Sequence, residues 1–178
     1  MYRNRIKRLL DILLSACGIL CLSWLLLLLT IAIKLDSPGP VFFKQKRVGI
    51  HKSYFNILKF RTMRIDTPHD MPTHLLHDPD QYITRMGHFL RKTSLDELPQ
   101  LWNILRGDMS LVGPRPERAY FYREFETYIP GFSNRMMVTP GLTGWAQVNG
   151  GYDLRPEEKI VYDMEYICLL YTSPSPRD

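Results

Sequence analysis

The chain has 178 residues, and its 23 Lys and Arg against 18 Asp and Glu give a formal charge of +5 and a pI near 9.2. Hydrophobic residues make up 45% and charged residues 23%, which excludes both a wholly disordered chain and a polytopic membrane protein. This length accommodates one compact domain and an appendage, but not two full domains. The 3 cysteines are too few for a disulfide framework, so we expect reduced thiols.

An apolar run covers residues 12–33 and contains no charged side chain over 22 positions. A continuous helix of this length would extend about 33 Å, which matches the hydrocarbon core of a bilayer. Basic residues flank the run on both sides: four lie within residues 3–8, and eight lie within residues 34–64 against the single acid Asp36. A straight span, which is the alternative, would carry one basic cluster across the membrane. The positive-inside rule therefore favours a helix that enters the membrane and returns to the same face.

A short hairpin is predicted after the turn at residues 36–40, where two prolines and a glycine end the helix. Residues 41–45 and 54–60 have the composition of strands, and the turn between them falls at residues 49–52. Residues 67–80 contain three prolines and little periodicity, which indicates a loop. The histidines of this loop are not spaced like metal ligands, so we expect no metal at His69, His74 and His77.

Three further helices are predicted by apolar spacing or by flanking prolines, at residues 95–106, 117–128 and 156–167. Residues 145–149 alternate in polarity between glycines, which is typical of a short strand. Together the elements predict an α+β fold. In it an N-terminal membrane-embedded, re-entrant helix precedes a small, mostly helical domain with a short β-hairpin.

Two adjacent carboxylates, Asp96 and Glu97, stand at the start of the helix predicted at residues 95–106. A purely structural role is open to them, because Ser94 and Glu97 have the spacing of a capping box and acids in a first turn complement the helix dipole. With Ser94 as the N-cap, Pro99 would delete a backbone hydrogen bond, whereas with Asp96 as the cap the missing N–H falls where none is needed. In either case Asp96 lies at a helix N-terminus, where phosphate groups bind well.

Basic residues near this pair suit phosphate chemistry. Arg91 precedes it, and Arg115 stands between Pro114 and Pro116 in a turn that would hold its guanidinium rigidly for a phosphate, although such a segment can also be only a turn. A carboxylate is ionised at neutral pH and can attack phosphorus without a separate base. Adjacent Asp and Glu cannot flank a glycosidic bond from two faces, which disfavours a glycosidase. One of them can instead attack while the other holds Mg²⁺, which binds one or two carboxylates plus substrate phosphates.

The chain resembles the bacterial sugar transferases, or monotopic phosphoglycosyl transferases, in six blocks that follow one another in the family's order. The first three blocks are KRLLD at residues 7–11, GPVFFKQKRVG at 39–49 and KFRTM at 59–63. The others are RKTSLDELPQL at 91–101, GDMSLVGPRP at 107–116 and PGLTGWAQVNG at 140–150. Each block alone is modest support for the family, but the ordered set is highly specific.

The resemblance implies an enzyme on the cytoplasmic face of the bacterial inner membrane. Such an enzyme transfers a sugar-1-phosphate from a UDP-sugar to undecaprenyl phosphate through a covalent aspartyl-phosphosugar intermediate and releases UMP. The reaction is the first membrane step of exopolysaccharide, capsule or other glycoconjugate synthesis. By the same resemblance Asp96 is the expected nucleophile, Glu97 the Mg²⁺ ligand, and Arg91 and Arg115 the phosphate binders. Membrane lipids are expected partners, and nucleic acid is not.

The chain departs from the family at two places. The family often breaks its membrane helix at a Ser-Pro pair, but here the pair is Ser23-Trp24, so a hydrogen bond from Ser23 to a carbonyl one turn earlier is the remaining way to bend the helix. The family also continues with an amphipathic segment after residue 167, so we expect that the C-terminus is truncated. The resulting division is a membrane-anchoring helix at 1–37, a catalytic sugar transferase domain at 38–167 and a non-native tail at 168–178.

The identity of the sugar is not encoded in any recognisable pattern. Trp145, Gln147 and Asn149 would share one face of the predicted strand, where they could contact a sugar or uracil, but an ordinary edge strand alternates in the same way. Two other classes of function stay open. The basic residues suit a membrane-tethered nucleic-acid binder, although no known nucleic-acid module is present, and a chain without activity could serve as a scaffold for polysaccharide enzymes.

Overall fold

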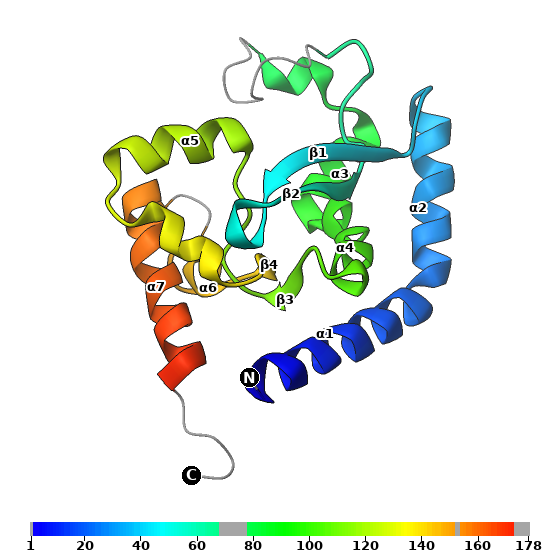
Figure 1. The fold of residues 1–178 in the computed structure, drawn as a ribbon. Helices are drawn as coiled ribbons and strands as arrows, with labels where there is room; N and C mark the ends of the chain where they lie inside the picture. The colour runs from blue at the N-terminus through cyan, green and yellow to red at the C-terminus, as the bar shows by residue number, and fades with distance from the viewer. Residues whose placement is uncertain (1, 68–77, 152–153, 173–178) are drawn as a thin grey trace.

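The computed structural model describes residues 2–67, 78–151 and 154–172, and these ranges fold into the expected α+β class with two sheets of two strands each (Figure 1). The structure begins with the helices α1 (Tyr2–Cys21) and α2 (Ser23–Asp36) and the hairpin of β1 (Phe42–Val48) and β2 (Tyr54–Phe60). The middle of the chain holds α3 (Arg85–Thr93), α4 (Gln100–Arg106) and β3 (Ser110–Val112). The C-terminal part holds α5 (Ala119–Tyr128), β4 (Gly141–Thr143), α6 (Trp145–Gly150) and α7 (Pro156–Thr172). Short 3₁₀ helices are η1 (Ile50–Lys52), η3 (Pro79–Tyr82), η4 (Leu95–Glu97) and η5 (Phe132–Met137).

The apolar N-terminal segment is bent. Helices α1 and α2 meet at an angle of 61° around Leu22. The hydroxyl of Ser23 donates to the carbonyl oxygen of Leu20 at 2.8 Å, so the hydrogen bond expected from the sequence accompanies the bend where no proline is present. Within the described ranges, no helix alone has the length and apolar composition to cross a bilayer, but the bent pair meets both criteria. The geometry is compatible with a broken span and with a re-entrant hairpin.

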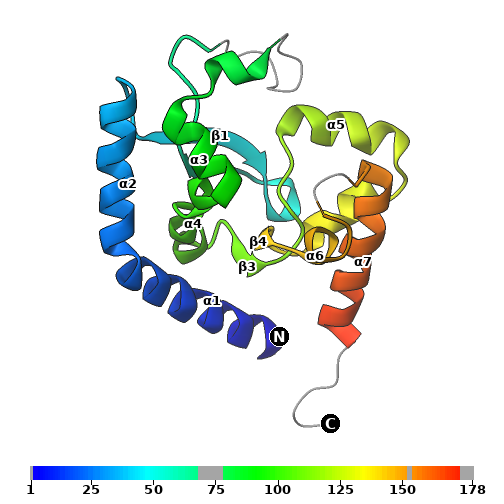
Figure 2. The ribbon, with the colours of Figure 1, turned by 180° about the vertical axis from the view of Figure 1, so that it is seen from behind.

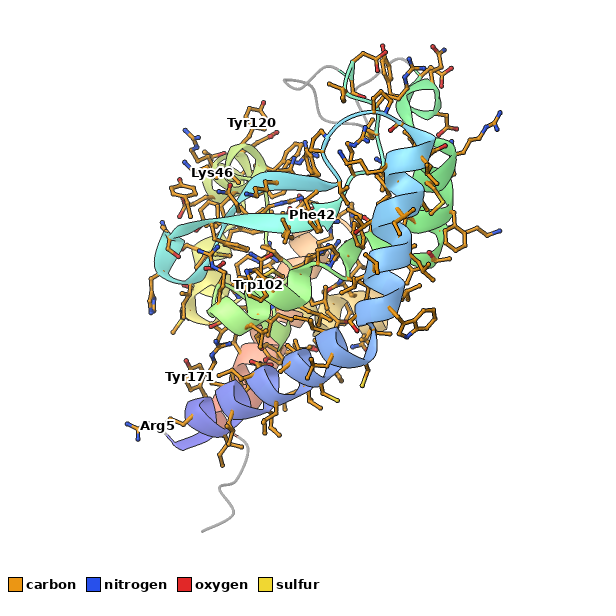
Figure 3. All side chains as sticks on the ribbon, turned by 90° about the vertical axis from the view of Figure 1, so that its right-hand side faces the viewer. Arg5, Phe42, Lys46, Trp102, Tyr120 and Tyr171 are labelled. Atoms are coloured by element: carbon orange, nitrogen blue, oxygen red, sulfur yellow. The ribbon has the colours of Figure 1, made fainter. Side chains whose placement is uncertain are left out.

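The two faces of the N-terminal pair differ in polarity. A stripe of small and polar residues on α1 faces the domain: Asp11 and Ser15 are buried, and a side chain at Gly18 would press against Leu101 of α4. On α2, Leu29 and Ile33 are buried against the hairpin and α3. Figure 3 shows the pair with side chains projecting away from the domain. Large apolar residues are exposed on the outward surface, namely Leu9, Leu10, Leu13, Leu14, Leu20, Trp24, Leu27, Leu28, Ile31 and Leu35.

The hairpin predicted around residues 49–52 is confirmed. Strands β1 and β2 are antiparallel, with Phe42 opposite Phe60 and Val48 opposite Tyr54, so the first strand ends three residues later than the predicted 41–45. Phe60 and Ile57 on β2 are buried and belong to two neighbouring parts of the core. In this register Lys59 pairs with Phe43, and the side chain of Lys59 reaches η4.

The helix predicted at residues 95–106 is interrupted. Helix α3, which the sequence patterns did not indicate, ends where Ser94 adopts a left-handed conformation with φ of 57°. Residues Leu95–Glu97 form the 3₁₀ turn η4, and α4 begins only at Gln100. Pro99 explains the break, because it has no N–H to continue the hydrogen bonding of an α-helix. Its neighbours form bonds of the tighter 3₁₀ type, from Leu101 N to Leu98 O at 3.1 Å.

Strands β3 and β4 pair in parallel and bring residues far apart in the sequence together. The strand predicted at residues 145–149 is wrong, because this segment is the helix α6 and Val148 N bonds to Gly144 O at 3.1 Å. Five residues are too few to distinguish a strand from one helical turn by periodicity. Figure 2, the view from behind, shows α6 and α7 together on the side of the domain away from α2.

The predicted ends of two segments are only partly described. Helix α7 runs to Thr172, five residues past the expected end at 167, so the first part of the segment at 168–178 continues this helix. Residues 173–178 lie outside the described ranges. Most of the loop predicted at residues 67–80 also lies outside them, including His69, His74 and His77.

Candidate active site

Asp96 and Glu97 lie in η4 beside a lysine from the hairpin. The ammonium nitrogen of Lys59 is 2.7 Å from Glu97 Oε1 and 3.7 Å from Asp96 Oδ2. The three side chains have between 14% and 20% of their surface exposed, so water reaches them without fully screening their charges. Because β2 and η4 pack together, a cation stands directly against both carboxylates.

Arg115 approaches the same carboxylate from the opposite side. Its NH1 donates to Glu97 Oε2 at 3.3 Å, and its NH2 is paired with Glu97 Oε1. NH1 also donates to the carbonyl oxygen of Leu142 on β4 at 3.4 Å. The backbone of Arg115 is held as well, because its carbonyl oxygen accepts from Arg135 NH2 at 3.0 Å. The rigid guanidinium expected from the flanking prolines is therefore fixed by contacts at both its head and its backbone.

Arg91 lies at the end of α3, on the Asp96 side of the cluster. Its Nε donates to the hydroxyl of Thr62 at 3.0 Å, and its charge acts on Asp96. Burial lowers the pKa of the Arg91 guanidinium, while the charge of Asp96 opposes that shift. The structure thus brings together all four residues expected at the site, and Arg91 stands at its more exposed edge.

The adjacent carboxylates are in different electrostatic states. Burial opposes the charge of Glu97, but its hydrogen bond to Arg115 and the charges of Arg115 and Lys59 outweigh burial and lower its pKa to about 2. For Asp96 burial prevails: it raises the pKa above its usual range, and the charge of Glu97 adds to this, although Lys59 and Arg91 act in the other direction. Glu97 is therefore ionised and paired with two cations. The cations near Asp96 do not fully offset the effect of its burial.

A capping role for the pair is wrong. Ser94 makes no side-chain cap hydrogen bond, and the residue at the N-cap of α4 is Pro99 rather than Asp96. The carboxylate of Glu97 is bound to Lys59 and Arg115 instead of reaching back to the backbone. Neither capping arrangement forms, although both acids still lie in the first turn of η4.

A cavity of about 120 Å³ is lined in part by Arg115. Gln147 lines it, and the side-chain oxygen Oε1 of Gln147 is buried without a hydrogen-bond partner among the described residues. Burial lowers the pKa of Arg47, another lining residue, to about 10, with Glu117 acting in the opposite direction. The cavity wall therefore carries donors and an acceptor suited to a polar ligand. Its remaining lining residues include Arg135, Lys159 and Asp163.

The three residues expected on one strand face lie on helix α6 and have different partners. Trp145 Nε1 donates to Glu165 Oε2 on α7 at 2.9 Å, and Asn149 Nδ2 donates to the carbonyl oxygen of Trp145 at 2.9 Å. Only Gln147 lines the cavity. The arrangement on one strand face is therefore wrong, and of the three residues Gln147 lines this cavity, while a ligand contact by Trp145 or Asn149 stays a prediction.

Sequence reasoning missed three basic residues of this region. Lys59 lies within a family block, yet nothing local indicates that it meets Glu97, because the contact depends on how the hairpin packs. Arg47 donates to the carbonyl oxygen of Pro116 at 3.1 Å and so braces the turn that carries Arg115. Arg135 is 1% exposed and pairs with Asp163, at 2.7 Å. The proline turn at Arg115 was the available signal, since a rigid segment of this kind needs neighbours to brace it.

The donor set of the acid pair can be compared with the needs of Mg²⁺. Across the described ranges there is no group of three or more His, Cys, Asp and Glu that could hold a metal ion. Mg²⁺ requires only one or two carboxylates when phosphate oxygens and water complete its shell. Asp96 Oδ2 and Glu97 Oε1 lie 3.7 Å and 2.7 Å from one cationic nitrogen, Lys59 Nζ. The two carboxylates therefore converge on one point, and such a pair fits Mg²⁺ in combination with a substrate phosphate. Glu97 is the expected protein ligand.

A partly buried carboxylate lies beside an ionised one, with Lys59 close to both and an arginine on each, an arrangement that suits chemistry on phosphate groups. The chain belongs to the bacterial sugar transferase family, whose sequence model matches residues 2–171. The six blocks of resemblance are thereby confirmed as marks of this family.

Named relatives agree with this membership. The chain is 43% identical over 166 residues to the UDP-glucose:undecaprenyl-phosphate glucose-1-phosphate transferase of Xanthomonas campestris pv. campestris, a match that covers 90% of this chain and 34% of the relative. It is 44% identical over 165 residues to the UDP-N-acetylgalactosamine-undecaprenyl-phosphate N-acetylgalactosaminephosphotransferase of Aeromonas hydrophila, covering 91% of this chain and 39% of the relative. A Bacillus subtilis (strain 168) protein, named as the uncharacterized sugar transferase EpsL, is 43% identical over 163 residues, with coverage of 91% and 77%. The chain thus spans well under half the length of the first two relatives.

Proposed function

We propose that this chain transfers a sugar-1-phosphate from a UDP-sugar to undecaprenyl phosphate, with Asp96 as the nucleophile. The observation that carries the proposal is the unequal acid pair: Asp96 has only a 3.7 Å contact with Lys59, while Glu97 is held closely by both Lys59 and Arg115. The names of the relatives, which include UDP-sugars and undecaprenyl phosphate, support both substrates. Synthesis of an exopolysaccharide or a related glycoconjugate is the expected pathway.

In the first step a carboxylate oxygen of Asp96 attacks the β-phosphorus of the UDP-sugar. The bond from this phosphorus to the oxygen that bridges the two phosphates breaks, and its electron pair leaves with UMP. Asp96 then carries the sugar-1-phosphate as an acyl phosphate. Partial burial helps the attack, because a carboxylate with fewer water molecules around it is a stronger nucleophile.

The surrounding cations stabilise the negative charge that develops in this step. Arg91 and Arg115 hold phosphate oxygens, and Lys59 offsets the charge of the acid pair. Glu97 would hold Mg²⁺ if it is bound, and the ion would further neutralise the charge of the diphosphate. The nucleotide is expected in the cavity beside Arg115, where Gln147 offers a carbonyl oxygen to a base N–H.

In the second step an oxygen of undecaprenyl phosphate attacks the phosphorus of the acyl phosphate. The bond to Asp96 breaks, the carboxylate is regenerated, and the lipid leaves as a diphosphate-linked sugar. The intermediate lets a water-soluble donor and a lipid acceptor react in turn at one carboxylate. A site beside a membrane surface is what this order of events requires.

The same proposal includes attachment to the cytoplasmic face of the bacterial inner membrane through residues 1–37. The exposed apolar surface of α1 and α2 and the basic residues at both ends support it. Single cysteines placed at Asn4 and Ser53, in a chain without its native cysteines, should both be shielded from an impermeant reagent in intact cells. Labelling at Asn4 alone would establish a straight span.

The covalent step is tested with a UDP-sugar labelled in its β-phosphate and no lipid acceptor. Label should stay on the denatured wild-type chain, be released by hydroxylamine, and be absent from Asp96→Asn. The matched control is Asp66→Asn, because Asp66 is 61% exposed and pairs with the exposed Arg64. Undiminished labelling of a folded Asp96→Asn variant would reject Asp96 as the nucleophile. A folded wild-type chain that takes up no label and releases no UMP would favour a scaffold.

A further inference from the structure

One turn of α1 contacts two elements, α4 and β3, that lie next to the site residues along the chain. Arg8 and Asp11 lie three residues apart and therefore face the same side of the helix. The NH2 of Arg8 donates to the carbonyl oxygen of Leu105, at the C-terminal end of α4, at 2.7 Å. Asp11 accepts from the backbone N–H of Leu111 at 3.0 Å and from the hydroxyl of Ser110 at 2.7 Å, both on β3.

The short strand β3 is held along both of its edges. On the β4 side, Ser110 N donates to Pro140 O at 2.8 Å and Gly113 N donates to Thr143 O at 2.9 Å. The N–H of Leu111 points to the other edge, where the carboxylate of Asp11 accepts it. Asp11 is 6% and Ser110 2% exposed, so water does not compete for these bonds. A hydrogen bond to an ionised acceptor is roughly twice as strong as one between neutral groups.

The two elements held by α1 set the distance between Glu97 and Arg115. Helix α4 begins three residues after Glu97, and β3 ends three residues before Arg115. The two side chains meet at 3.3 Å between Arg115 NH1 and Glu97 Oε2. Figures 1 and 2 both show α1 running directly below β3 and α4. A shift of either element against α1 would therefore change the spacing of the two charged groups.

We propose that Asp11 and Arg8 are positioning residues, which fix α4 against β3 and thereby hold Arg115 at the distance from the acid pair that phosphate transfer requires. The catalytic part of this inference rests on the proposed function. The helix that anchors the chain is then also one wall of the active-site framework. Loss of Asp11 should reduce phosphate transfer even in protein that stays folded and attached to membranes.

The first test measures backbone hydrogen exchange of the full chain in phospholipid vesicles. Asp11→Asn should raise exchange several-fold in residues 110–116, because Leu111 loses a charged acceptor, while the amides of α5 exchange as before. Asp11→Ala should have a larger effect, since an amide oxygen can still accept from Leu111 and a methyl group cannot. Asp66→Asn is the control for removal of one exposed carboxylate. Unchanged exchange in residues 110–116 for both Asp11 variants would overturn the proposal.

The second test is a double-mutant cycle on the rate of UMP release. Asp11→Asn should lower kcat/KM about ten-fold, in keeping with the effect of small misplacements on catalysis, and mainly through kcat. In the Arg115→Lys background, Asp11→Asn should change kcat/KM by less than about two-fold, because the group being positioned is already altered. A ten-fold effect in both backgrounds would show that Asp11 only stabilises the fold and would overturn the proposal.

Two further outcomes keep the proposal separate from the proposed function. Ser110→Ala removes one of the two bonds that β3 donates to Asp11 and keeps the Leu111 bond, so an intermediate effect is expected even if the Asp11 variants fold poorly. Full activity together with wild-type hydrogen exchange in Ser110→Ala would count against the positioning role of Asp11. If the wild-type chain releases no UMP, the proposed function fails, and the exchange of residues 110–116 alone then decides whether α1 fixes β3.

Discussion

Two clusters of arginine and carboxylate lie on either side of the Arg115 turn, and they differ in how far water reaches them. In the first, Arg115 is 31% and Glu97 15% exposed, and Lys59 supplies a second cation. In the second, Arg135 is 1% and Asp163 2% exposed, and their closest atoms are 2.7 Å apart. Arg135 also donates to the backbone of Arg115, so the buried cluster supports the more open one.

The electrostatics of the two acids differ accordingly. The Arg115 hydrogen bond and the two cations overcome burial and lower the pKa of Glu97 to about 2. Burial raises the pKa of Asp163 in spite of the charge and hydrogen bond of Arg135. Ion pairs of the same composition can therefore serve different purposes. The open cluster has cations that can exchange a carboxylate for a phosphate, whereas the buried one holds the backbone of Arg115 in place.

The largest effect is expected from breaking the buried cluster. Arg135→Met should lower the free energy of unfolding by about 3 to 5 kcal/mol, because Asp163 is left buried without its cation. Chemical denaturation in detergent micelles measures the change. The double variant with Asp163→Leu is the control, and it should recover a large part of the loss. A loss under about 1 kcal/mol for Arg135→Met would contradict the supporting role.

The open cluster should respond in activity instead. Arg115→Met should reduce kcat/KM about 100-fold, which corresponds to about 2.7 kcal/mol of transition-state stabilisation. The free energy of unfolding should change by less than about 1.5 kcal/mol, since Lys59 still pairs with Glu97. Rates of UMP release and denaturation curves on the same preparation test both statements. A rate loss that merely follows the folded fraction would remove the distinction between the clusters.

A smaller effect is expected in the pH dependence of stability. The pKa of Glu97 lies near 2 in the folded chain, below its ordinary value of 4.5, so its ion pairs stabilise the fold above pH 4.5 and lose that contribution as the pH falls toward 2. Allowing for partial exposure, wild type should exceed Glu97→Gln by about 2 kcal/mol at neutral pH, and the difference should vanish near pH 2.

Asp163 has a raised pKa, so its contribution has the opposite sign: it is present at low pH and lost as the pH rises through the folded value. Comparing wild type with Glu97→Gln at each pH removes this background, because both chains contain Asp163. Denaturation curves between pH 2 and pH 7 provide the measurement. A difference that stays constant across this interval would show that Arg115 and Lys59 do not perturb Glu97.

The smallest effect separates the two residues of α6 that the sequence had grouped. Gln147→Ala should raise KM for the UDP-sugar about five-fold, because the buried Oε1 loses its place in the cavity wall. Trp145→Phe removes only the bond to exposed Glu165 and should leave KM within about two-fold of wild type. Initial rates over a range of UDP-sugar concentrations test both variants. An equal rise in KM for both variants would indicate that Trp145 also contacts the substrate.

Local patterns were sufficient for part of this architecture. The hairpin was predictable because strand composition and turn residues agree within 20 positions, and Asp96, Glu97, Arg91 and Arg115 stand in family blocks. The left-handed turn at Ser94 and the break at Pro99 were not resolved, because several caps competed over six residues. Residues 145–149 were misassigned since so short a segment contains less than two helical turns.

Contacts between distant segments were not predictable from these patterns. Lys59 meets Glu97 only because the hairpin packs on η4, and no spacing within the sequence expresses that packing. Arg135 and Asp163 each look like surface charges when viewed alone. Their burial becomes evident only when η5 and α7 are placed side by side. The grouping of the four expected site residues was therefore predictable from the sequence, and the contacts that orient them were not.

The contact between Asp11 and Ser110 also has a consequence for the order of folding. The two residues are separated by 99 positions, so during synthesis the carboxylate of Asp11 emerges long before its partner exists. At about 5 to 20 residues per second, this interval lasts about 5 to 20 seconds. Under the proposed membrane attachment, the first helix therefore has time to meet the lipid surface as a nascent chain before the domain can close on it. The contacts around Arg115 are completed only when β4 has been made. The site therefore matures after the first helix has had this time to reach the lipid surface.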